Sequence, residues 1–269
     1  MEFREYINKL RREEKAQHIE LDQDKEPQYL EFHKYRFDRI IDSIPRCQHP
    51  IRILDIGTTP FTFFIKELFP HYEVSTFDLT NLMEDRCKTH DILFKVCDLD
   101  NQLVPFENDY FDVAIFTEVL EHVFAPPTVV LKEIRRIMRS RGKLILSVLN
   151  IATLVNRIKL VFGITPLPNP NSQLKKNWVH GHGHIHEYTM KEINSILEVC
   201  NFAISEKEFL QGSVLGRAPS EEGRCSCALI VSVYHAVCSL VPSFRPTIYV
   251  ECFKPPKSRL RTRLLEEPL

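Results

Sequence analysis

The chain has 269 residues, of which 43% are hydrophobic and 26% are charged, and its formal net charge at pH 7 is −1. This length accommodates one large α/β domain with appendages and requires no second core. The near-neutral charge excludes a global electric field that would recruit nucleic acid or an anionic membrane, and the composition is ordinary for a soluble globular protein.

The first elements that we expect are helical. Residues 1–26 are rich in Glu, Lys, Arg and Gln, which is typical of a loosely held helix or a tail. Apolar residues at helical spacing then predict a helix over residues 27–44, which ends before Pro45. Residues 1–48 are therefore predicted to form an N-terminal helical extension.

Apolar strands alternate with helices in the next part of the chain, residues 49–150, which we expect to form the cofactor-binding core. Residues 113–116 are all apolar, as expected of a strand that is buried on both faces of a sheet. This alternation predicts an open parallel sheet with right-handed crossovers, which binds its ligand at the carboxyl ends of the strands. The predicted strands are residues 51–57, 73–77, 92–96, 113–116 and 143–148, and the predicted helices are residues 61–69 and 127–139. We expect Gly142 to lie in the C-cap region of the second helix.

The pattern changes beyond Asn150. Residues 151–188 contain a predicted helix over residues 151–162, a run rich in Pro and Asn, and a run of histidines, and we expect them to form a lid over the ligand. Residues 189–269 are predicted to add C-terminal helices and the last strands, over residues 202–209 and 247–253. An uncharged stretch, Cys225–Phe244, predicts a buried or interfacial helix rather than a membrane span.

One stretch has the layout of a nucleotide-binding βαβ unit. The first strand ends at Asp55 and Gly57, and the second strand ends at Asp78, which lies 78 − 57 = 21 residues after the glycine. A glycine lets the backbone approach a ligand, and a carboxylate about 20 residues later can accept hydrogen bonds from both ribose hydroxyls. Thr59 and Thr62 occupy the positions of the later glycines that seat a dinucleotide pyrophosphate, which argues against a nicotinamide or flavin dinucleotide.

Four motifs, taken in order, resemble those of class I S-adenosylmethionine-dependent methyltransferases: ILDIG at 53–57, FDL at 77–79, VCDL at 96–99 and FDVAIF at 111–116. The resemblance covers residues 28–150 well and the remainder loosely. It implies an α/β fold in a single domain over residues 1–269: a Rossmann-like, seven-stranded, mostly parallel sheet with helices on both faces and an antiparallel last strand. The first loop departs from the usual Gly-x-Gly-x-Gly, because Thr59 and Phe61 replace the later glycines.

S-adenosylmethionine carries its own activated methyl group, so the protein supplies geometry. The resemblance implies that Asp55 and Gly57 lie under the methionine moiety, while Asp78 holds the ribose. Asp98 and Leu99 would meet the adenine. The start of the following helix can receive the methionine carboxylate, because a helix N-terminus favours an anion. The predicted cofactor-binding residues are Asp55, Gly57, Thr58, Thr59, Pro60, Asp78, Leu79, Asp98, Leu99 and Glu118.

A second group follows the fourth strand. If the segment is helical, Glu118, Glu121 and His122 share one face, and two carboxylates with an imidazole suit a divalent ion. The pattern resembles metal-assisted O-methyltransferases, including those of small-RNA ends, in which His182 or His184 would complete the site. Many small-molecule methyltransferases have a similar pair without metal, in which the first acid contacts the cofactor. A divalent metal is therefore an alternative that we do not favour.

Histidines at positions 180, 182, 184 and 186 alternate with Gly and Ile, so an extended segment would place all of them on one side. Such a row suits metal ligands or a lid that faces the substrate, and a solvated loop is the alternative. A histidine there could deprotonate a substrate hydroxyl, which is typically worth about 10²–10⁴-fold in rate. We predict His186 or His184 as the base, ahead of His122.

The sequence thus predicts a methyltransferase that O-methylates a small hydroxylated or glycan-like acceptor. The acceptor class is implied by a loose resemblance to methyltransferases of bacterial surface-carbohydrate pathways. The alternatives are a non-catalytic binding module with an altered glycine loop, and a metal-dependent RNA-end 2′-O-methyltransferase, which the near-neutral charge disfavours. Eight scattered cysteines and the lack of a signal-peptide core predict a cytoplasmic location, with no transmembrane span and with peripheral membrane contact as an open alternative.

Overall fold

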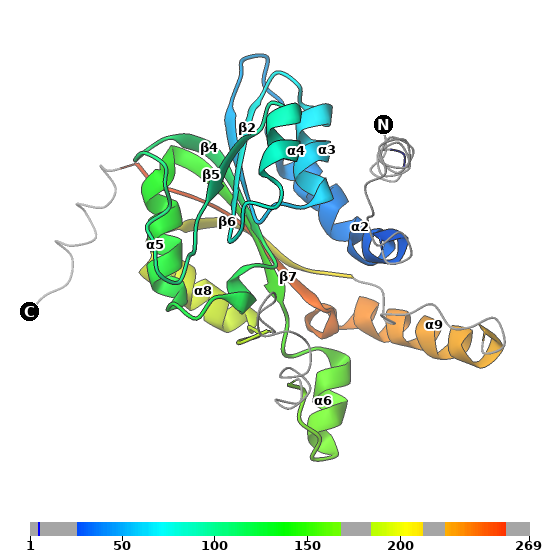
Figure 1. Cartoon of the computed structure of the whole chain (residues 1–269). Coiled ribbons are helices and arrows are strands. Elements are labelled where there is room, and N and C mark those ends of the chain that lie inside the picture. The colour runs from blue at the N-terminus through cyan, green and yellow to red at the C-terminus, as the bar shows by residue number, and fades with distance from the viewer. Residues whose placement is uncertain (1–4, 6–25, 168–183, 212–223, 257–269) are drawn as a thin grey trace, which may run out of the picture.

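The computed structural model describes residue 5 and residues 26–167, 184–211 and 224–256. Its centre is a seven-stranded sheet of order β3-β2-β1-β4-β5-β7-β6 (Figure 1). Strand β7 is antiparallel to both of its neighbours, and the other pairings are parallel, which confirms the predicted sheet. The strands are β1 (Arg52–Ile56), β2 (Glu73–Asp78), β3 (Leu93–Val96), β4 (Phe111–Thr117), β5 (Met138–Leu149), β6 (Ala203–Leu210) and β7 (Thr247–Phe253).

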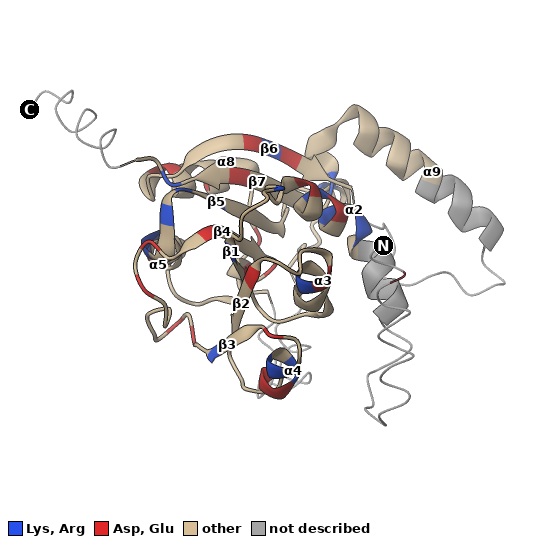
Figure 2. Ribbon diagram, turned by 90° about the horizontal axis from the view of Figure 1, so that it is seen from above, with Lys and Arg blue, Asp and Glu red and all other residues tan. Residues whose placement is uncertain are grey.

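Helices cover both faces of the sheet, as predicted. Seen from above, α5 and α8 lie on one side of the strands, and α2 and α3 lie on the other (Figure 2). None of the helices in the described part of the chain is both long and apolar enough to cross a membrane. The helices are α2 (Glu26–Ser43), α3 (Pro60–Leu68), α4 (Glu84–Thr89), α5 (Pro127–Ile137), α6 (Leu154–Val161), α8 (Met190–Val199) and α9 (Arg224–Leu240), with short 3₁₀ turns at η1 (Leu120–His122) and η3 (Pro242–Phe244).

Strand β4 explains why its sequence is apolar throughout. Successive side chains of a strand point to opposite faces, so Ala114 and Phe116 pack into the core beneath α5 and α8. Val113 and Ile115 pack into the second core, beneath α2 and α3. The two cores meet only through the sheet, and the carboxyl ends of the parallel strands remain as the edge at which a ligand can be held.

Two predicted boundaries were wrong. Helix α5 ends at Ile137 rather than Arg139, and β5 begins at once, because Met138 pairs with Phe111 before a shift in register. Gly142 therefore lies inside β5 and is no helix cap; a Cβ atom there would lie 2.9 Å from the carbonyl oxygen of Arg139. The predicted helix at residues 151–162 begins only at Leu154, where the Thr153 side chain accepts a hydrogen bond from the third residue after it.

Candidate functional site

A cavity of about 160 Å³ opens at the carboxyl ends of β1, β2 and β3. Five of the ten predicted cofactor-binding residues line it: Gly57, Asp78, Leu79, Asp98 and Leu99. Asp55, Thr58, Thr59, Pro60 and Glu118 are not among the described residues of its wall. The wall also includes Asp100, Val119, His122 and Val123, of which only His122 had been singled out from the sequence.

Gly57 directly follows β1 and lines the cavity. Its φ of +83° is a backbone conformation that residues with a side chain rarely adopt. Its N–H donates to the carbonyl oxygen of Phe77 at 3.1 Å. A Cβ atom at this position would lie 3.1 Å from Cγ2 of Val119. Glycine is therefore required here both by the backbone and by the neighbouring side chain.

Asp78 is held in a fixed orientation by two backbone amides. Its Oδ2 accepts a hydrogen bond from the Thr58 N–H at 2.9 Å, and its Oδ1 accepts one from the Leu79 N–H at 2.7 Å. A carboxylate has about four acceptor sites, so two remain for a ligand. This arrangement suits a pair of ribose hydroxyls at the edge of the cavity.

The threonines that replace the loop glycines close the turn before α3. Thr59 is the N-cap of the helix, and the Thr62 hydroxyl accepts a hydrogen bond from the Thr59 N–H at 3.1 Å. The same hydroxyl donates to Oδ2 of Asp55 at 2.7 Å. Burial raises the pKa of the Asp55 carboxyl to about 7, although Thr62 and Arg36 oppose the shift. Asp55 thus braces the loop beneath the cavity.

Asp98 closes the turn that follows β3. Its Oδ1 accepts from the Asp100 N–H at 2.9 Å, and its Oδ2 accepts from the Asn101 side-chain amide at 2.7 Å. Asp100 in turn accepts from the Ala125 N–H at 2.7 Å, which ties this turn to the segment before α5. The wall at this end of the cavity is therefore shaped by a hydrogen-bonded turn, which the four-residue motif did not indicate.

The segment after β4 is not a helix that includes Glu118. Glu118 has a φ of +55°, so it cannot begin a helix, and only Leu120–His122 form a 3₁₀ turn. Oε1 of Glu118 lies 2.6 Å from Nη1 of Arg36 on α2, and the two side chains are 17% and 5% exposed. The helical condition under which Glu118, Glu121 and His122 would share one face is therefore not met, and Glu118 instead contacts α2.

Glu121 is fully buried. Burial, followed by the nearby Glu118 charge, raises the pKa of the Glu121 carboxyl to about 8. No donor in the described residues hydrogen-bonds to its carboxyl oxygens, while its backbone carbonyl accepts from the Ile185 N–H at 2.7 Å. Glu121 therefore connects the end of β4 to the histidine segment.

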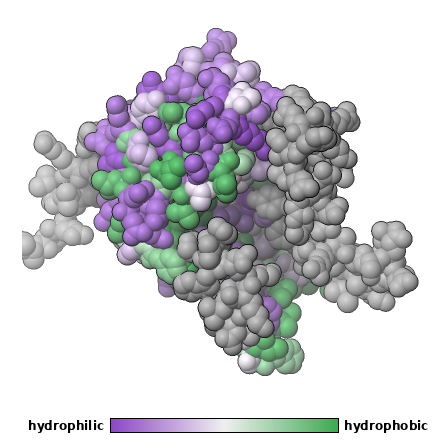
Figure 3. All heavy atoms as spheres, viewed as in Figure 1, coloured by the Kyte–Doolittle hydropathy of each residue, from purple (hydrophilic) through white to green (hydrophobic). Residues whose placement is uncertain are grey.

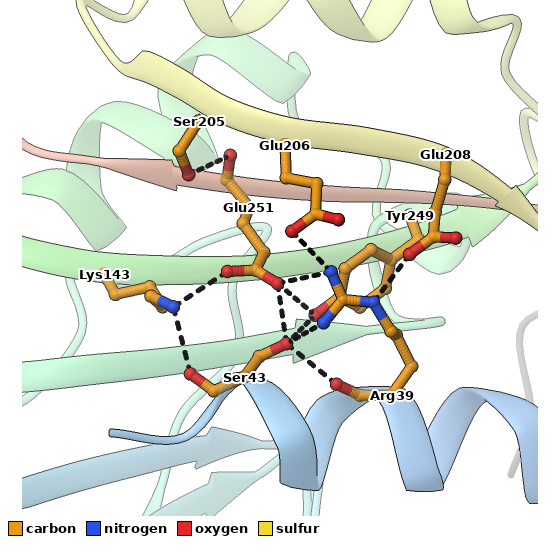
Figure 4. A network of polar contacts seen from close by, with 8 residues as sticks. All are labelled: Arg39, Ser43, Lys143, Ser205, Glu206, Glu208, Tyr249 and Glu251. Atoms are coloured by element: carbon orange, nitrogen blue, oxygen red, sulfur yellow. Dashed lines mark hydrogen bonds and ion pairs between the residues drawn. The ribbon is translucent and has the colours of Figure 1, made fainter. Parts of the chain in front are cut away.

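A polar network fixes α2, and with it Arg36, against the sheet (Figure 4). Arg39, one turn after Arg36, lies 2.6 Å from Glu206, 2.6 Å from Glu208 and 2.8 Å from Glu251. Further contacts in this network come from Ser43, Lys143 and Tyr249.

The predicted bases lie at different distances from the cofactor cavity. His122 lines the cavity, and its ring packs edge-on against the ring of His184 with centroids 4.9 Å apart. Nδ1 of His184 lies 3.5 Å from Oε1 of Glu187, which raises the pKa of the histidine. His186 lines a separate cavity of about 410 Å³, and its Nε2 lies 3.6 Å from Oε1 of Glu192. Val123 lines both cavities, so they adjoin.

The residues considered as metal ligands do not form a metal site in the described part of the chain. No group of three or more His, Cys, Asp or Glu side chains is placed there to hold a metal ion. His182 lies outside the described residues, as does much of the predicted lid.

A family model described as "Methyltransferase domain" matches residues 29–207. None of the curated proteins is similar enough in sequence to match the chain. An S-adenosylmethionine-dependent methyltransferase from Archaeoglobus fulgidus has a similar structure, with 16% identity and a TM-score of 0.54 over 84% of this chain and 99% of that chain. A second such enzyme, from Methanosarcina mazei, has 17% identity and a TM-score of 0.51, over 80% and 97% of the two chains.

Phosphoethanolamine N-methyltransferase 2 from Haemonchus contortus, in complex with S-adenosyl-L-methionine, is also similar. It has 16% identity and a TM-score of 0.55, and the alignment covers 82% of this chain and 52% of that chain. At such identities the likeness is one of fold.

Proposed function

The chain belongs to the methyltransferase family and is an S-adenosylmethionine-dependent enzyme, and from this premise we propose that it methylates a hydroxyl oxygen of a small or glycan-like acceptor. The cofactor, when bound, supplies a methyl group activated by the sulfonium. The residues present fit such a group, because Gly57 leaves room for close approach and Asp78 offers two free acceptor sites. The remaining task for the protein is to accept the proton of the hydroxyl.

The observation that carries the proposal is the pair His184 and Glu187 beside His122. A carboxylate near one ring nitrogen orients a histidine and leaves its other nitrogen to take a proton. The side chain of His184 is 35% exposed, so it can be reached, and its ring contacts a residue of the cofactor cavity. In this proposal Nε2 of His184 accepts the proton of the acceptor hydroxyl, and the bound cofactor would supply the methyl group that replaces this proton on the oxygen.

His186 is proposed to act on the acceptor from the adjoining cavity. Its neighbours there include Glu192 and Ser195 on an otherwise largely apolar wall, which offers both hydrogen bonds and an apolar contact surface to a sugar-like ring. The carboxylate of Glu192 lies near Nε2 of His186 and can hold the ring in place.

The test compares His184→Ala and His186→Ala with His49→Ala, a control at an exposed histidine in the segment between α2 and β1. Methyl transfer is measured with a panel of simple sugars, a catechol and primary amines, and cofactor affinity is measured separately by calorimetry. We expect loss of the base to lower turnover by about 10²–10⁴-fold, with cofactor affinity nearly unchanged. Full turnover in both variants, or transfer to amines alone, would contradict the proposal.

A further inference from the structure

Helix α6 and the residues that follow it stand away from the body of the protein (Figure 1). None of the eight residues of α6 is buried. The exposed fractions of Leu160, Val161, Phe162 and Ile164, which we call the α6 tip, are 59%, 81%, 74% and 55%. Figure 3 shows apolar residues at the lower end of the molecule, where α6 lies. Contiguous apolar side chains of this kind mark an interaction site.

The charge around the α6 tip has one sign. The described residues 149–167, which include α6 and its tip, contain Arg157 and Lys159 but no Asp or Glu, although the whole chain has 36 acidic residues against 35 Lys and Arg. We call residues 154–164, from the start of α6 to the end of its tip, the arm. The Arg157 guanidinium packs over the ring of Phe244 at 5.3 Å, so one of these cations lies near the base of the arm. The arm therefore combines an apolar end with a basic flank.

A second apolar element without acidic residues leaves the protein from the same place. Asn150, at the end of β5, donates through its side-chain amide to the carbonyl oxygens of Ser243 at 2.9 Å and Arg245 at 2.7 Å, so the base of α6 adjoins the end of α9. Leu240 at that end is 84% exposed. Residues 224–250 include no Asp or Glu, and the described side chains of α9 carry no charge (Figure 2).

We propose that the α6 tip inserts into the interface of an anionic membrane. A narrow, projecting tip offers little flat area to a protein partner, whereas a lipid interface accepts a few apolar side chains individually. Basic residues beside such a tip are attracted to anionic headgroups by about 1 kcal/mol each. The chemistry of the arm, which is apolar at its end and cationic at its flank, therefore matches a lipid surface.

The contact would set the orientation of the enzyme. Helix α6 follows β5, so the arm leaves from the carboxyl edge of the sheet, where the cofactor cavity opens. An acceptor attached to a lipid would then meet the enzyme at this edge. That consequence rests on the proposed function, whereas the membrane contact does not.

The experiment is flotation of the full chain with vesicles of phosphatidylcholine, with and without phosphatidylglycerol. We expect binding to the anionic vesicles that weakens as salt is added, and we expect Val161→Asp together with Phe162→Asp to lower the bound fraction by about tenfold or more. Leu103→Asp is the matched control, because Leu103 is 76% exposed and lies in the loop between β3 and β4. Circular dichroism confirms that each variant is folded.

Three outcomes would overturn the proposal. The first is no binding of the wild-type chain to either vesicle, and the second is equal binding of the double variant and the Leu103 control. The third is a wild-type oligomer that the double variant converts to a monomer while vesicle binding is absent, which would make the α6 tip a contact between copies. Because the readout is binding, a failure of the proposed O-methylation leaves the result unaffected.

Discussion

Arg36 of α2 and Glu118 after β4 form an ion pair with 2.6 Å between Nη1 and Oε1, almost entirely inside the protein. The same guanidinium lowers the pKa values of Asp55 and Glu121 against the larger effect of burial. The Arg36 guanidinium therefore interacts favourably with three carboxyl groups, those of Asp55, Glu118 and Glu121. Helix α2 thus packs on the sheet and also supplies the positive charge that stabilises these carboxylates.

We expect Arg36→Met to lower the free energy of unfolding by about 3–5 kcal/mol, because it leaves buried carboxylates without their cation. Urea unfolding at a pH slightly above neutral measures the loss. Lys34→Met is the matched control, since Lys34 is an exposed cation on the same helix. The addition of Glu118→Gln to the Arg36 variant should recover part of the loss. Equal stability of the Arg36 and Lys34 variants would contradict the prediction.

Stability should decrease as the pH rises through neutrality. The pKa values of Asp55 and Glu121 are raised from 3.8 and 4.5 to about 7 and about 8. Between these limits the folded protein retains protons that the unfolded chain has released, so their contribution to the free energy of unfolding falls with rising pH. Thermal unfolding of Glu121→Gln should show a shallower decline from pH about 5 to about 8. An unchanged decline would show that Glu121 is not the titrating group.

Asp78→Ala should weaken binding of S-adenosylhomocysteine by roughly 1–3 kcal/mol, because a ligand loses hydrogen bonds to a charged acceptor. Calorimetric titration gives the affinity directly. Asp85→Ala is the control, since the Asp85 side chain is fully exposed in α4. A titration with NAD in parallel tests cofactor choice, and tight binding of NAD with no response to S-adenosylhomocysteine would overturn the cofactor assignment.

Turnover should survive EDTA. Glu118 is engaged with Arg36, and the raised pKa of Glu121 favours its protonated form near neutral pH, in which a carboxyl is a poor metal ligand. Of the residues considered as metal ligands, Glu118 is therefore already paired with a cation, and Glu121 is protonated in a large fraction of the molecules. The comparison is between enzyme dialysed with and without chelator. Loss of turnover that Mg²⁺ or Mn²⁺ restores would establish a metal site and would point to His182 as a further ligand.

The sheet could be predicted because β1 and β4 are apolar runs and because the order of the motifs follows the order of the strands. The cavity could be placed for the same reason, since Gly57 and Asp78 stand at strand ends. The resemblance also anticipated that β7 is antiparallel.

The detailed roles of several residues depend on contacts that no local pattern reveals. The left-handed backbone of Glu118 accompanies an ion pair with a residue far back in the chain. Both carboxylate oxygens of Asp98 accept hydrogen bonds from residues of its own turn. Thr59 had been predicted to bind the cofactor and Thr62 had been interpreted only as a missing glycine, whereas the Thr59 hydroxyl caps α3 and the Thr62 hydroxyl donates to Asp55.

The position of β7 between β5 and β6 has a consequence for synthesis of the protein. Strand β6 pairs with β7, so it has no partner in the sheet until residues 247–253 have left the ribosome. Until then β5 also presents an open edge, which invites pairing with another nascent chain. Glu251 of β7 then joins the network that holds Arg39, so arrival of this strand also fastens α2 over the site. The sheet can therefore be completed only after residues 247–253 have been synthesised.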